Sequence, residues 1–82
     1  MVVTSPAAGA TVSSPVHFVA SASAPNPITA MKIYVDSIGV YTVNAAKLDT
    51  SLTMAKGSHN VTVKAWDNAA GVYSKSFTIT VN

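Results

Sequence analysis

The chain has 82 residues, no cysteine and a formal net charge of +2. This length allows one domain over residues 1–82, and the lack of cysteine excludes disulfides and thiolate metal sites. The five lysines are scattered, unlike the clustered cations of a nucleic-acid binder. No apolar run approaches the roughly 20 residues of a membrane-spanning helix, and no signal peptide is visible. We therefore expect no nucleic-acid partner and no membrane insertion.

Composition favours strands over helices. Val, Thr and Ser are abundant, whereas Glu, Arg and Gln are absent. The β-branched residues suit a pleated, half-buried surface, and the absent long side chains are those that suit an exposed helix. The chain is therefore expected to be all-β.

Alternation of apolar and polar residues sets the expected strands in chain order. Val2–Thr4 forms a short edge strand that Pro6–Gly9 interrupts. Thr11 and Val12 resume it, either in the same sheet or against the other sheet. Further strands are expected at 16–23, 28–36, 40–44, 48–54, 59–66 and 73–81.

Aspartates mark two of the expected turns. Asp36–Gly39 has Asp at the first and Gly at the fourth position, which predicts a type I turn. Asp67–Gly71 predicts a hairpin loop in which Gly71 takes a positive φ. Calcium prefers several acidic residues close together, so we expect Asp36, Asp49 and Asp67 each to bond its own turn backbone instead. No metal site is predicted.

About seven short antiparallel strands with no helix predict an immunoglobulin-like β-sandwich with Greek-key connections. A small closed barrel is the alternative.

Three stretches resemble a known family. Val3–Val12 is similar to its Ser-Pro…Gly-x-x-Val opening, and Lys32–Asp36 to its x-Tyr-Val-Asp-Gly strand and turn. Gly57–Gly71 is similar to its Gly-x-His-x-Val-x-Val-x-Ala-x-Asp-x-Ala-Gly segment, with one extra Ala, and Ser37 stands where the family often has Gly. The chain thus resembles the bacterial Ig-like domains that occur in tandem in secreted and cell-surface proteins. The resemblance implies an extracellular or cell-surface location and neighbouring domains of a parent chain as partners. It supplies no catalytic, cofactor or metal residues.

The residues themselves predict no enzyme. No Gly-x-Ser-x-Gly elbow is present, and no general base stands beside a nucleophile in a recognisable arrangement. His59 opens a strand where immunoglobulin domains often have a tyrosine that bonds to the preceding loop, so we expect a hydrogen-bonding corner there. His17 is expected to be an exposed strand residue. No cofactor is implied.

One sheet face is a candidate ligand surface. Tyr34 and Trp66 are expected to point outward from neighbouring strands, with Lys32, Lys64 and Ser74 beside them. Aromatic side chains present flat apolar area with a polar tip, so this face can bind a polysaccharide or another protein. The alternative is an ordinary aromatic pair half covered by lysine stems. The facing of Tyr41 and Tyr73 is left open.

Three functions follow from these features. The first is a structural or spacer module of a larger protein. The second is a carbohydrate-binding or adhesive module that uses the Tyr34 and Trp66 face. The third is a homodimer, formed through a Ser- and Thr-rich face or through the N-terminal edge strand.

Overall fold

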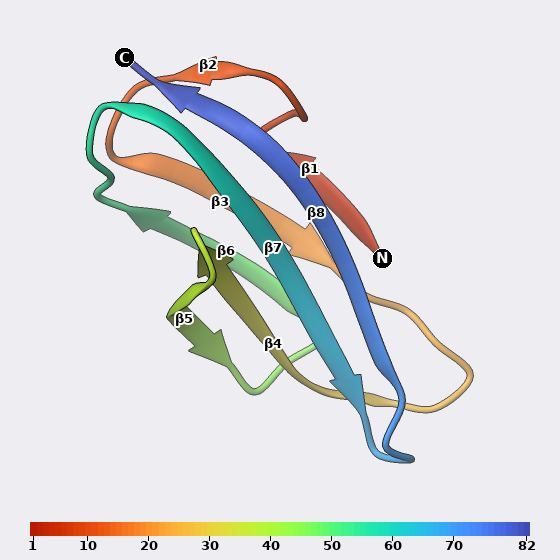
Figure 1. The fold of residues 1–82 in the computed structure, drawn as a ribbon. Helices are drawn as coiled ribbons and strands as arrows, with labels where there is room; N and C mark the ends of the chain where they lie inside the picture. The colour runs from red at the N-terminus through yellow and green to blue at the C-terminus, as the bar shows by residue number, and fades with distance from the viewer.

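The computed structural model describes all of residues 1–82 and forms two packed sheets (Figure 1). The smaller sheet has the strand order β1-β3-β6, with bounds β1 (Val2–Ser5), β3 (Val16–Ser21) and β6 (Lys47–Leu52). The larger has the order β2-β8-β7-β4-β5, with bounds β2 (Thr11–Val12), β8 (Val72–Val81), β7 (Gly57–Asp67), β4 (Ile28–Val35) and β5 (Ile38–Val43). No helix is long and apolar enough to cross a membrane.

The connections confirm the predicted sandwich. Only β4–β5 and β7–β8 are hairpins within one sheet, and every other connection crosses to the opposite sheet. The sheets stay separate, so the closed barrel was wrong. The structure has eight strands instead of about seven, because Thr11 and Val12 form a strand of their own in the second sheet. That strand runs parallel to β8, so the strands are not all antiparallel.

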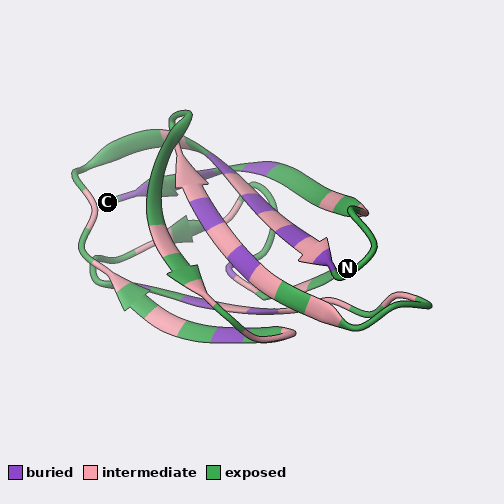
Figure 2. Cartoon of the chain, turned by 90° about the horizontal axis from the view of Figure 1, so that it is seen from below, coloured by how far each residue is buried: buried purple, intermediate pink, exposed green.

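The core lies between the two sheets, on the faces that alternation predicted. Along β7, Val61, Val63 and Ala65 are fully buried and the residues between them are half-buried, which gives the banding in Figure 2. Burying a large apolar side chain contributes about 1.5–3 kcal/mol. This packing holds a fold that has no disulfide. The core residues are Val16, Phe18, Ala20, Met31, Ile33, Leu48, Val61, Val63, Ala65, Phe77, Ile79 and Val81.

The turn between β4 and β5 differs from the expected type I turn. Val35 pairs with Ile38, which leaves Asp36 and Ser37 as a two-residue loop with φ of 51° and 69°. Two positive φ angles define a type I′ hairpin, which matches the right-handed twist of its strands. The expected turn over Asp36–Gly39 was wrong because the next strand begins at Ile38.

The loop between β7 and β8 uses its glycine differently from the prediction. The positive φ, 64°, belongs to Ala70, and Gly71 has none. A Cβ on Gly71 would collide with the Asp67 carboxylate, at 2.8 Å from its carbon. Gly71 is therefore required for close approach and not for its backbone angle.

Candidate functional site

The outward side of the five-stranded sheet holds all five residues of the candidate ligand surface. Val61, Val63 and Ala65 point into the core, so strand alternation turns Lys64 and Trp66 outward. We call this surface the outer face and define it by Lys32, Tyr34, Thr62, Lys64, Trp66, Ser74 and Ser76.

Strand register fixes the order of side chains on the outer face. Lys32 on β4 is directly opposite Lys64 on β7, and Lys64 is in turn opposite Ser74 on β8. Tyr34 is opposite Thr62, whereas Trp66 is opposite Ala30. The two aromatic residues are therefore not a cross-strand pair. They flank the two lysines on either side.

The ring of Tyr34 lies beside the ammonium groups of both lysines. The Nζ atoms of Lys32 and Lys64 each lie 5.2 Å from the centre of its ring, within the range of a cation–π interaction. Gly39 on β5 leaves room for this arrangement, because a Cβ there would lie 2.5 Å from Cε of Lys32. The lysine stems thus lie along the sheet and hold two positive charges beside one ring.

Tyr41 and Tyr73 do not join the outer face. Both pack against the core cluster, and the hydroxyl of Tyr73 donates to Oδ2 of Asp67 at 3.1 Å. This bond is the main reason that the pKa of Tyr73 is raised.

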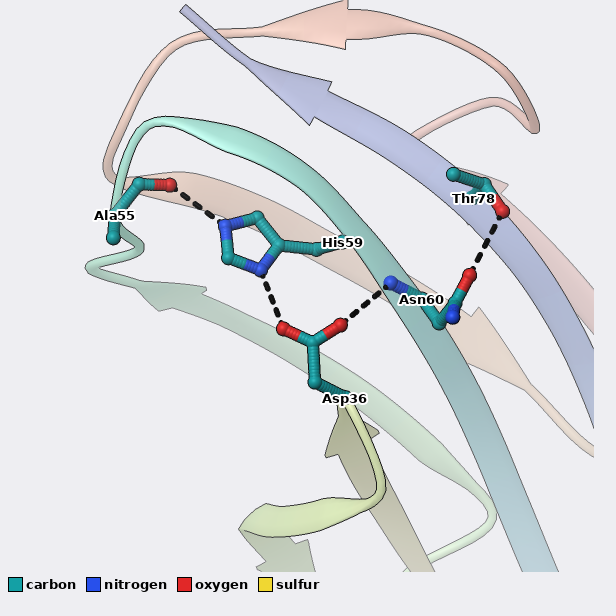
Figure 3. Close-up of polar contacts among 5 residues, drawn as sticks. All are labelled: Asp36, Ala55, His59, Asn60 and Thr78. Carbon is teal, nitrogen blue, oxygen red and sulfur yellow. Dashed lines mark hydrogen bonds and ion pairs between the residues drawn. The ribbon is translucent and has the colours of Figure 1, made fainter.

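His59 and Asp36 form a polar corner at the start of β7 (Figure 3). Nδ1 of His59 lies 2.8 Å from Oδ2 of Asp36, and Nε2 lies 2.7 Å from the carbonyl oxygen of Ala55. A carboxylate and a carbonyl oxygen both accept, so the two contacts are satisfied together when both ring nitrogens carry a proton, which is the positively charged form of the imidazole. The bond to Ala55 confirms the expected contact with the preceding loop. The bond to Asp36 had no local sequence signal.

These bonds shift the pKa values of both partners. The hydrogen bond to Asp36, followed by that to Ala55, raises the pKa of His59. The bond from His59 and a 3.0 Å bond from the backbone N–H of Asn60 lower the pKa of Asp36. The expectation that Asp36 bonds its own turn was wrong, because its carboxylate reaches β7 instead.

A cleft of about 420 Å³ lies beside this corner, between β5 and the β6–β7 connection. Ile38 and Val40 of the edge strand β5 are 67% and 45% exposed there. The sequence indicates the apolar strand but not the cleft, which depends on how two edge strands meet. The lining residues are Val35, Asp36, Ile38, Val40, Leu52, Thr53, Met54, Ala55 and His59.

The other two aspartates lie elsewhere. Oδ1 of Asp67 accepts from the backbone N–H of Ala69 at 2.9 Å and of Gly71 at 2.6 Å, which confirms the expected turn and lowers its pKa. Asp49 is on β6 and pairs with exposed His17 of β3, so a turn role for Asp49 was wrong. Asp36 and Asp67 lie at opposite ends of the β4–β7 ladder. No three His or Asp side chains gather to hold a metal ion.

Comparison with known proteins agrees with this architecture. Residues 1–63 match the bacterial Ig domain family. The chain belongs to that family. This bacterial Ig domain also superposes on a solved fibronectin(III)-like module of Clostridium thermocellum CbhA, with a TM-score of 0.84 and 17% sequence identity. That match covers 96% of this chain and 91% of the other, and it supports the fold alone. No curated protein sequence matches the chain.

Proposed function

We propose that this bacterial Ig domain is a non-catalytic structural module that spaces or joins neighbouring domains of a larger secreted or cell-surface protein. The supporting observation is its shape. The domain is elongated, 39 × 19 × 18 Å. Its C-terminus lies at one end, and its N-terminus lies well apart from it, part-way toward the β7–β8 hairpin at the other end (Figure 1). Domains joined through such ends extend the parent chain instead of folding it back.

The interior supports the same role. Every buried side-chain nitrogen and oxygen has a hydrogen-bond partner within the chain, and buried polar groups without one are costly. The buried polar side chains therefore need no ligand to complete their hydrogen bonds. Bacterial Ig domains commonly occur in extracellular or surface proteins and are typically non-catalytic, which agrees with this role.

Small-angle X-ray scattering on one, two and three copies joined head to tail tests the spacer function. We expect the largest particle dimension to grow with each copy by about the 39 Å length of the domain. Copies that fold back into a compact particle would contradict it. The particle mass of the single domain in the same series tests the homodimer, which stays a prediction. A homodimer requires twice the monomer mass.

A second function is favoured by the outer face. Tyr34, Trp66 and two lysines lie on one sheet surface whose neighbouring strand supplies the hydroxyls of Ser74 and Ser76. Aromatic rings with hydroxyl and ammonium donors beside them match the apolar faces and hydroxyls of sugars. We propose that the module also binds glycans through this face.

A panel of soluble bacterial and plant polysaccharides, read by the fluorescence of Trp66, tests this second function. Because the chain has one tryptophan, the signal reports on the outer face. Calorimetry then compares Trp66→Ala with Tyr41→Phe, whose aromatic ring is not on the outer face. We expect only Trp66→Ala to lose binding. A panel without any response would leave the spacer function standing alone.

A further inference from the structure

The lysine pair of the outer face has no anionic partner within the chain. The ion pairs of the protein are His17 with Asp49 and His59 with Asp36. Lys32 and Lys64 are directly opposite each other on neighbouring strands, and like charges in that position are destabilising. Cation–π contact with Tyr34 offsets only part of this repulsion, since such contacts contribute about 0.5–1 kcal/mol at exposed sites.

The two carboxylates of the five-stranded sheet already have hydrogen-bond partners within the chain. Asp36 follows Tyr34 by two residues, but its oxygens accept from His59 and from the backbone of Asn60. The carboxylate of Asp67 is bound within its own turn. The two ammonium groups therefore remain available to an anion from outside.

Aromatic side chains bracket the lysine pair along the strands. Tyr34 is two residues from Lys32 on β4, and Trp66 is two residues from Lys64 on β7, on the other side of the lysine row. At about 3.4 Å per residue, the Tyr34 row and the Trp66 row, four residues apart along each strand, are separated by roughly 14 Å. Exposed Val72 is opposite Trp66 and extends the apolar area at that end.

We propose that the outer face binds a linear acidic polysaccharide, with a uronate carboxylate between Lys32 and Lys64 and an adjoining sugar ring against Trp66. This rests on the glycan-binding function proposed above and names its ligand class. The face matches a carboxylate-bearing chain because its two positive charges lie together beside the Tyr34 ring, while Trp66 and exposed Val72 supply apolar area two residues further along the strands. Nucleic acid is a poorer match, since its recognition requires many more phosphate contacts than two lysines supply.

The first arm of the test varies the ligand. Polygalacturonate is compared with its fully methyl-esterified form, which keeps the sugar and removes the charge, and with neutral xylan. Poly-glutamate tests whether charge alone is sufficient. Binding is measured at low ionic strength by calorimetry and by the fluorescence of Trp66. We expect polygalacturonate to bind and the two uncharged chains to bind at least about tenfold more weakly, the effect of losing one charged interaction. Poly-glutamate should also bind at least about tenfold more weakly, because it has no sugar ring to place against Trp66.

The second arm varies the protein. Lys32→Met and Lys64→Met keep the apolar stem and remove the charge, and Lys47→Met on β6 removes one charge from the opposite sheet. We expect the first two to weaken polygalacturonate binding about tenfold each and Lys47→Met to change it less than about twofold. Circular dichroism verifies that each variant is folded.

The outcomes separate this inference from the glycan function. Equal binding of acidic and esterified chains, with the lysine variants unaffected, would leave glycan binding in place and overturn the acidic specificity. Poly-glutamate binding as tightly as polygalacturonate would overturn the sugar preference in favour of an acidic peptide. Lack of binding to every glycan would overturn both the glycan-binding function and the acidic specificity that rests on it.

Discussion

The two hairpins of the five-stranded sheet place the same residue type in similar settings and use it differently. Asp36 follows β4 and Asp67 ends β7, and each hairpin contains a non-glycine residue with a positive φ. Asp67 is buried and binds the N–H groups of its own loop. Asp36 is exposed and reaches another strand, where it bonds His59.

The difference separates local from long-range chemistry. The loop after Asp67 follows the common Asx pattern, in which an aspartate bonds backbone two residues on, and sequence alone predicts it. The bond of Asp36 depends on β4 and β7 being neighbours in register, which no local pattern encodes. The β7–β8 hairpin is thus held by neutral backbone donors, and the β4–β5 hairpin by a charge that depends on pH.

Among the substitutions that test this comparison, Gly71→Ala should have the largest effect on stability. The added Cβ would displace the carboxylate of Asp67 and leave the N–H groups of the loop and the hydroxyl of Tyr73 without their acceptor. Leaving buried donors unpaired is costly, so we expect the melting temperature to fall by roughly 5–15 °C. Thermal unfolding followed by circular dichroism measures it.

Ala70→Gly is the matched control in the same loop. It removes the cost of a positive φ at a residue with a Cβ, so stability should be unchanged or slightly higher. If Gly71→Ala were as stable as the wild type, the close approach of Asp67 would not be needed.

His59→Gln should have the next largest effect, and one that depends on pH. The pKa of His59 is raised above 6.5 in the folded state. Its stabilising effect is therefore complete below about pH 6.5 and is lost as the pH rises through the raised value. The lowered pKa of Asp36 makes its contribution present above about pH 4 and lost as the pH falls through the lowered value.

We therefore expect His59→Gln to lower the melting temperature by roughly 4–8 °C at pH 5.5, with the difference shrinking toward pH 9. Melting temperatures in buffers from pH 3 to pH 9 measure it. His17→Gln is the control, because His17 is exposed on the other sheet. Its melting temperature should fall above pH 6.5 in the same way as that of the wild type. If the melting temperature of His59→Gln fell by the same amount above pH 6.5, the His59–Asp36 corner would not be the cause of the pH dependence.

Ser37→Gly should have the smallest effect and the opposite sign. Ser37 has a φ of 69° in the type I′ turn, and Asp-Gly is a preferred pair for such turns. Relief of this strain should raise the free energy of unfolding by about 0.4–1 kcal/mol. Urea denaturation measures it. A loss of stability would mean that the Ser37 side chain contributes a contact of its own.

Sequence alone predicted the features that depend on alternation. The inward set of β7 and β8, such as Val61 and Phe77, and the outward Lys32 and Trp66 all follow from the two-residue period of a strand. The features that it missed depend on pairing. The partner of Asp36, the lysine row between Tyr34 and Trp66, and the cleft beside β5 each require knowing which residues of distant strands lie opposite one another.

The short parallel strand β2 has a mechanical consequence. The N–H of Gly9 bonds to the carbonyl of Thr78 at 2.7 Å, that of Thr80 to Ala10 at 2.9 Å, and that of Asn82 to Val12 at 2.9 Å. Because β2 and β8 run parallel, tension applied to the two ends of the domain pulls these strands in opposite directions along their length. The three bonds are loaded together in shear and must break nearly at once. A domain built this way resists stretching at the β2–β8 pair once β1 has been drawn away from β3.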